Sequence, residues 1–119
     1  MKYAAALLMT ALAVPLAAAP GGGIATMPIG TYVCELPGDA AGPAGKHVPE
    51  ADFSIVSASS YQAGTAMGAY LLTGDRLTMT SGPRRGQRYH RLSTGFLRLI
   101  GPDGKDSDLR CVRQTRNNR

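Results

Sequence analysis

Hydrophobic and polar residues alternate in short runs along most of this chain. In the run ADFSIVS, residues 51–57, Phe53 and Ile55 fall on one face and Asp52 and Ser54 on the other. Alternation with a period of two predicts half-buried β-strands. No helical period is found after residue 20. We count seven or eight strands among the runs at residues 30–36, 51–57, 59–63, 68–72, 76–81, 87–92, 95–101 and 108–113.

Glycine and proline separate these runs at short intervals. Residues 73–76 and 101–104 carry the glycine and aspartate of hairpin turns. The longest connection, residues 37–50, is rich in glycine, alanine and proline, and we expect a mobile loop or an arm over one end of the domain. The pattern predicts an all-β fold, a small antiparallel meander of seven or eight strands that forms a closed or half-closed barrel.

The N-terminal segment has the composition of a secretory signal peptide. A short positive start precedes residues 4–19, an uncharged run rich in alanine and leucine. The run is broken by Pro15 and is too short for a good membrane span. We predict a signal peptide over residues 1–18 with cleavage after Ala18, or after Ala25 as the alternative. An alanine-rich N-terminal helix is the competing interpretation.

Cleavage leaves about 100 residues, enough for one small domain. We expect a flexible leader at residues 19–29, a single β domain at 30–113 and a disordered tail at 114–119. The expected location is periplasmic or secreted, with no transmembrane span after cleavage of the signal.

Two cysteines, Cys34 and Cys111, lie near the start and the end of the predicted domain. In an oxidising compartment such a pair is best interpreted as a disulfide. The bond would join the first and last strands, as a closed sheet requires. Two free thiols or a metal pair are the alternatives, although neither cysteine has the neighbouring ligands of a zinc site.

Basic residues are concentrated in the C-terminal part. Residues 19–83 hold two basic and five acidic side chains, whereas residues 84–119 hold ten basic and three acidic ones. This bias predicts either a site for an anionic partner or the solvated face of a hairpin. A signal peptide and few aromatic residues for base stacking disfavour nucleic acid. The candidate residues for an anionic partner are Arg84, Arg85, Arg88, Arg91 and Arg98.

No catalytic constellation is recognisable. A hydrolase built on His90 would use Ser81 or Ser93 as its nucleophile, and Asp75 would orient the ring. However, the chain has no Gly-x-Ser-x-Gly elbow and no His-Glu-x-x-His motif. The acidic cluster at residues 103–108 lacks the closing glutamate of a calcium loop. We therefore expect no enzyme, no metal and no cofactor, with the hydrolase as a remote alternative.

Four tyrosines fall within the predicted strands. They either fill the core with their hydroxyls at its rim or line a ligand cavity inside the barrel. The four are Tyr32, Tyr61, Tyr70 and Tyr89.

The segments GTYVCELPGDAAGPAG, FSIVSASSY, GAYLLTGDRLTMTSGP and LRCVR resemble a group of short secreted alphaproteobacterial proteins of unknown function. Some of that group carry the label elongation factor P. That label does not suit this chain, because about 100 residues cannot form three β-barrel domains and a translation factor needs no signal peptide.

The chain is also similar, more distantly, to the periplasmic inhibitors of C-type lysozyme, small eight-stranded barrels with a cysteine near each end. Their Ser-Gly-x-x-Tyr motif has a counterpart in SGPRRGQRY, residues 81–89, although four extra residues stand before the tyrosine. The resemblance implies an inhibitory loop at Ser81 and Gly82, with Arg84 or Arg98 as the basic partner. The tryptophan-lysine strand of that family is absent.

These observations predict a non-enzymatic, exported envelope protein, a small β-barrel binding module with a basic C-terminal half. Its expected partner is an anionic envelope component or another protein. The alternative is a periplasmic protein that resembles the lysozyme inhibitors.

Overall fold

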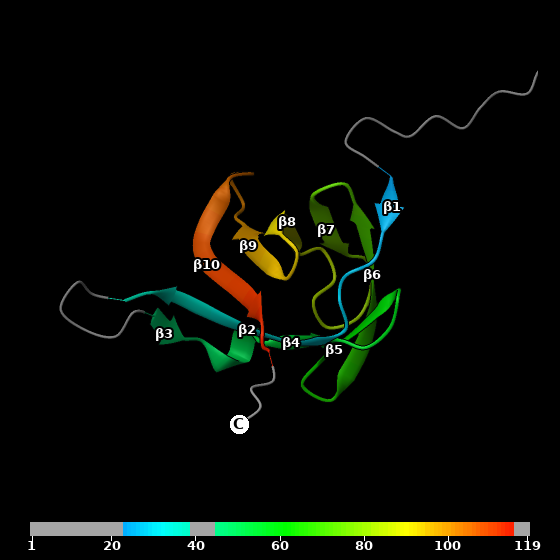
Figure 1. The fold of residues 1–119 in the computed structure, drawn as a ribbon, viewed down its shortest axis with the longest axis horizontal. Helices are drawn as coiled ribbons and strands as arrows, with labels where there is room; N and C mark the ends of the chain where they lie inside the picture. The colour runs from blue at the N-terminus through cyan, green and yellow to red at the C-terminus, as the bar shows by residue number, and fades with distance from the viewer. Residues whose placement is uncertain (1–22, 39–44, 116–119) are drawn as a thin grey trace, which may run out of the picture.

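The structure, a computed structural model, describes residues 23–38 and 45–115 (Figure 1). The predicted signal peptide, the start of the leader and the end of the tail lie outside these residues. Within the described ranges no helix is long and apolar enough to cross a membrane. The same ranges form β1 (Ile24–Ala25), β2 (Gly30–Pro37), β3 (Gly45–His47), the 3-10 turn η1 (Pro49–Ala51), β4 (Phe53–Ile55), β5 (Ser60–Ala63), β6 (Ala66–Thr73), β7 (Arg76–Met79), β8 (Arg88–Ser93), β9 (Phe96–Ile100) and β10 (Asp106–Arg113).

Eight of these strands form a closed antiparallel barrel. From β4 to β10 each strand pairs with the next along the chain, β2 pairs with β4, and β10 returns to pair with β2. Figure 1 shows β10 curving back to meet β2. The prediction of an all-β antiparallel meander is confirmed, and the closed form is the one adopted. Closure removes the long unpaired edges that an open sheet of this size would expose.

The predicted disulfide lies at the closing pair of strands. Cys34 in β2 is the direct cross-strand partner of Cys111 in β10, and the two sulfur atoms are bonded. Both side chains are fully buried. The covalent bond therefore ties the first barrel strand to the last.

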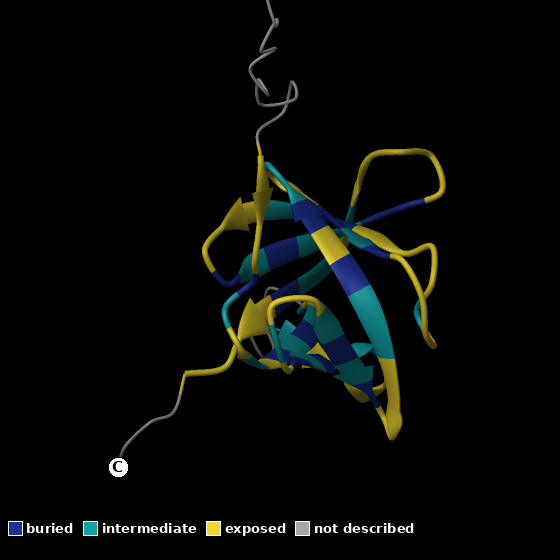
Figure 2. Ribbon diagram, turned by 90° about the vertical axis from the view of Figure 1, so that its right-hand side faces the viewer, coloured by how far each residue is buried: buried dark blue, intermediate teal, exposed yellow. Residues whose placement is uncertain are grey.

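The barrel interior is filled by the apolar side of each strand, as the alternation predicts. Figure 2 shows buried and exposed residues alternating along the strands. The four strand tyrosines are core residues, and burial raises the pKa of the Tyr32 hydroxyl to about 12. Each hydroxyl is hydrogen-bonded, so the rings serve as packing and not as the lining of an open cavity. The hydroxyls donate from Tyr32 to the carbonyl of Pro28 (2.8 Å), from Tyr61 to that of Ser81 (2.8 Å), from Tyr70 to that of Ser57 (3.2 Å) and from Tyr89 to Oε1 of Gln87 (2.9 Å).

Residues 19–29 were predicted as a flexible leader, and this prediction is wrong for residues 23–29, which are attached to the barrel. β1 pairs with the C-terminal end of β6. Met27 is 2% exposed, and its backbone N–H donates to the hydroxyl of Tyr70 at 3.0 Å. A single buried methionine in this segment gives no periodic pattern of hydrophobic residues, so the alternation did not predict the segment as a strand.

The long connection at residues 37–50 is partly regular. β3 pairs with the end of β2, with Glu35 opposite His47, and η1 follows directly. Nε2 of His47 lies 2.8 Å from Oδ2 of Asp52. Residues 39–44 lie outside the described part of the chain.

Candidate functional site: the arginine loop and the basic face

The connection from β7 to β8, residues 80–87, is held in one shape by its own backbone. We call it the arginine loop. Met79 and Gln87 form the hydrogen-bonded neck of the loop, because the N–H of Met79 donates to the carbonyl of Gln87 at 2.9 Å. Inside the neck, the N–H of Gly86 donates to the carbonyl of Met79 at 2.8 Å. The left-handed φ of +94° at Gly86 allows this turn, because glycine has no Cβ to collide with the backbone.

The side chain of Tyr61 joins the arginine loop to the barrel. Its hydroxyl donates to the carbonyl of Ser81 and accepts from the N–H of Arg84, both at 2.8 Å. At Gly82, a Cβ would lie 2.5 Å from the Cα of Gly68, so the loop and β6 touch through two glycines. The position of the loop is therefore determined by β5 and β6, which lie far from it in sequence.

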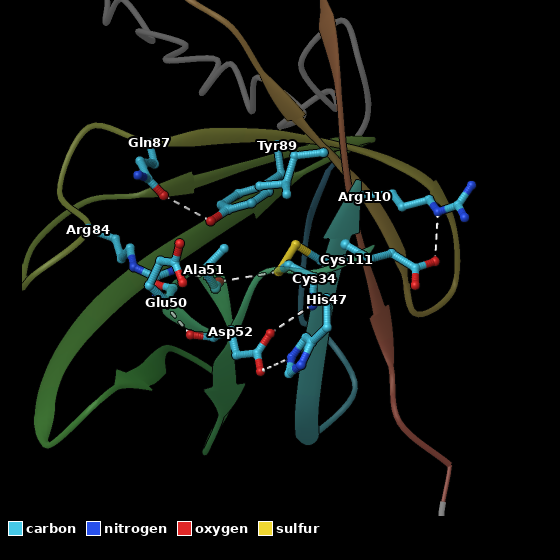
Figure 3. Close-up of a disulfide and its surroundings, with 12 residues drawn as sticks. Cys34, His47, Glu50, Ala51, Asp52, Arg84, Gln87, Tyr89, Arg110 and Cys111 are labelled. Atoms are coloured by element: carbon cyan, nitrogen blue, oxygen red, sulfur yellow. Dashed lines mark hydrogen bonds and ion pairs between the residues drawn. A yellow bond between two sulfur atoms is a disulfide. The ribbon is translucent and has the colours of Figure 1, made fainter. Parts of the chain in front are cut away.

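Arg84 anchors the loop to the 3-10 turn η1. Its guanidinium donates to the carbonyls of Glu50 (2.9 Å), Ala51 (2.8 Å) and Asp52 (2.8 Å), and Figure 3 shows the side chain directed toward this segment. The guanidinium carbon also lies 5.9 Å from the centre of the Phe53 ring. Three of the hydrogen-bond donors of Arg84 are thus used inside the protein, and we assign this arginine a structural role in place of the predicted partner contact.

Two other predicted arginines are also engaged within the chain. Arg91 donates to the carbonyl of Gly74 at 3.1 Å, and Arg98 donates to that of Ser107 at 3.3 Å. The Nε of Arg98 is buried without a partner among the described residues. These contacts leave Arg85 and Arg88 as the members of the predicted set that are exposed and have no hydrogen bond or ion pair with the described residues.

A third exposed arginine lies beside them and was not predicted. Thr78 of β7 is opposite Arg88 of β8, which places the outward-facing Arg76 on the diagonal from Arg88. We call Arg76, Arg85 and Arg88 the basic face. The alternation in residues 76–81 places Arg76 on the outer face of its strand. The register of β7 against β8, which brings Arg76 near Arg88, cannot be predicted from one sequence.

Arg76 of the basic face also belongs to a row of charged residues and histidines that crosses neighbouring strands of the barrel. Arg76, His90, Arg98, Arg110, Glu35 and His47 occupy directly opposite positions on six neighbouring strands. Nε of Arg110 lies 2.9 Å from Oε2 of Glu35. Among the described residues, Arg110 is thus the one arginine of the C-terminal half that is ion-paired with a carboxylate.

His90 lies between two carboxylates on the outside of the barrel. Its Nδ1 is 2.9 Å from Oδ2 of Asp106, and its Nε2 is 3.1 Å from Oδ2 of Asp75. The hydrogen bond to Asp106 is the main cause that raises the pKa of His90 above 6.5. The predicted contact with Asp75 is present, whereas Asp106 was not foreseen.

The serines of the alternative hydrolase are not directed at His90. Both ring nitrogens face carboxylates, and the hydroxyl of Ser81 accepts from the N–H of Ala69 at 3.0 Å. Ser93 lies at the far end of β8. The inhibitory loop implied by resemblance, Ser81 and Gly82, is also attached to the barrel. The hydroxyl and carbonyl of Ser81 are hydrogen-bonded within the protein, and the backbone at Gly82 packs against β6. Among the described residues no cluster of histidine, cysteine and carboxylate side chains could hold a metal ion.

The fold and this site define a small disulfide-tied meander barrel that presents a rigid basic loop. No protein-family model, curated protein or solved structure compared with the chain matches it.

Proposed function

We propose that this protein is an exported, non-enzymatic binding module that holds an anionic envelope component on its basic face. The observation that carries the proposal is the anchoring of the arginine loop. Arg84 and Tyr61 fix the loop from both sides, so that the neighbouring Arg85 stands in solvent on a rigid support. A site that is ordered before binding loses less conformational entropy when its partner arrives.

The chemistry of the basic face favours phosphate, sulfate or carboxylate groups. Guanidinium groups bind such anions through two parallel hydrogen bonds. Arg76 and Arg88 lie on neighbouring strands of the convex outer surface, and Arg85 lies on the loop that leads into Arg88. Three such side chains favour a partner that carries several anionic groups.

Binding to a heparin oligosaccharide, a sulfated probe, tests the site directly. The double variant Arg85→Ala/Arg88→Ala is expected to bind about tenfold more weakly than the native protein. The matched control is Lys46→Ala/Lys105→Ala, which removes the same net charge from two exposed side chains outside the basic face and should change the affinity by about twofold or less. Calorimetric titration at two salt concentrations measures both variants, and native binding should weaken with salt.

Equal losses of heparin affinity in the two double variants would show that heparin responds only to the net charge of the protein. That result would contradict a site at the basic face. Absence of heparin binding by the native protein would contradict the proposed function. Arg84 is left unchanged in this test, because its replacement would disturb the loop together with the charge.

Export is supported by the apolar run at residues 4–19 and by the disulfide, since such bonds persist in oxidising compartments. The intact mass of the natively produced protein should correspond to a chain that starts at Ala19, and thiol alkylation should add mass only after reduction. Cleavage after Ala25 would remove β1 (Ile24–Ala25), which pairs with β6, so we expect the earlier site. A full-length mass with two free thiols would contradict export.

A further inference from the structure

The geometry around His90 requires a second ring proton. Asp75 and Asp106 approach opposite nitrogens of the imidazole, at 3.1 Å and 2.9 Å. A carboxylate only accepts hydrogen bonds, so each contact needs an N–H on the ring. A neutral imidazole has one N–H and therefore supports only one of the two contacts. Both together are the signature of the charged imidazolium.

The two carboxylates are not held equally. Asp106 places both of its oxygens near Nδ1, at 2.9 Å and 3.1 Å, and its side chain is 36% exposed. Asp75 offers one oxygen to Nε2, and its side chain is 62% exposed. When the ring loses one proton, the remaining N–H stays on Nδ1 with Asp106. The lone pair of Nε2 then faces the carboxylate of Asp75, which is repelled and released.

The released carboxylate belongs to the basic face. Asp75 directly precedes Arg76, and Arg76 lies opposite His90 in the register. Arg88 lies two residues before His90 and on the same side of β8. Loss of the proton therefore removes one positive charge beside the face and frees one negative charge next to Arg76.

The charges around His90 come from every neighbouring element. The turn before β7 contributes Asp75, β7 contributes Arg76, β9 contributes Arg98 and β10 contributes Asp106. Desolvation of the ring opposes protonation and the aspartates favour it. The aspartates prevail, because the hydrogen bond to Asp106 is the largest cause of the raised pKa of His90. The midpoint of the change therefore lies above pH 6.5.

We propose that His90 is a proton-sensitive gate on the basic face. With the charged ring, Asp75 is held away from the arginines and an anionic partner has free access to them. With the neutral ring, Asp75 turns to Arg76 and competes with that partner. This inference rests on the proposed function, because it concerns the regulation of the same site.

The experiment measures the affinity for the heparin oligosaccharide from about pH 5.5 to about pH 9, across the range in which histidine titrates. The native protein is expected to bind about two- to fivefold more weakly at the upper end than at the lower end. His90→Gln, which cannot become charged, should show a flat profile. The matched control His47→Gln changes the other histidine, which is paired with Asp52 and contacts neither Asp75 nor Asp106, and should keep the native profile. Thermal unfolding verifies that each variant is folded.

Asp75→Asn is the second test, and it removes the competing carboxylate while it leaves the ring in place. This variant should bind at least as tightly as the native protein at the upper pH and should lose most of the pH dependence. Native binding with a flat profile, or a sloping profile retained in His90→Gln, would overturn the gate while leaving the basic face intact. Failure of the native protein to bind at any pH would overturn the face and the gate together.

Discussion

Replacing Cys34 and Cys111 together by alanine is expected to lower the free energy of unfolding by about 4 kcal/mol. The bond closes a separation of 77 residues, and a cross-link over so long a segment removes much of the freedom of the unfolded chain. Both side chains are fully buried, so alanine is preferred to serine, which would bury an unpaired hydroxyl. For a domain of this size we expect the melting temperature to fall by about 20 °C.

Urea unfolding of the native protein with and without a thiol reductant provides the matched control. Reduction should lower the stability of the native protein by a similar amount and should leave the double variant unchanged. A difference of less than about 1 kcal/mol between native protein and double variant would mean that the β2–β10 pairing is secure without the bond.

The effect of the bond follows from its place in the topology. From β4 to β10 each strand pairs with its sequence neighbour across a short connection, whereas β2 and β10 come from opposite ends of the domain. Bringing distant segments together carries the largest loop-closure entropy in a meander. Among the described strands, the disulfide lies at the pairing with the longest separation along the chain.

The fold was predictable because its signals are local. Alternation in runs such as residues 51–57 identifies the strands, and glycine with aspartate at residues 73–76 identifies a turn. The positions of Cys34 and Cys111 near the two ends of the domain also predicted a disulfide, which is a long-range contact between the first and last barrel strands. β1 was missed, because two exposed residues and one buried methionine leave no periodic trace.

The site was less predictable because it depends on register and loop shape. Arg84 and Arg85 are adjacent and chemically identical, yet one is directed inward to η1 and the other outward to solvent. The contact between His90 and Asp106 spans sixteen residues and depends on an irregularity in the β9–β10 pairing. No composition or spacing rule encodes such geometry.

Replacing Arg84 by alanine is expected to lower the free energy of unfolding by about 3 kcal/mol, whereas Arg85→Ala should change it by about 0.5 kcal/mol or less. The first change leaves the carbonyls of three successive residues, 50–52, without their charged donor. It also removes the link that fixes the arginine loop to η1. The second change removes only an exposed side chain.

Arg84→Lys separates the geometry of the side chain from its charge. A lysine ammonium is a compact point charge and cannot reproduce the planar fork that reaches three carbonyls at once, so most of the loss should persist. Urea unfolding of the three variants measures the effect, and heparin titration below the unfolding transition should show weaker binding by Arg84→Ala even though Arg85 and Arg88 are retained. Equal stability of Arg84→Ala and Arg85→Ala would contradict the anchoring role. The rigidity of the arginine loop would then no longer support the basic face as a binding site.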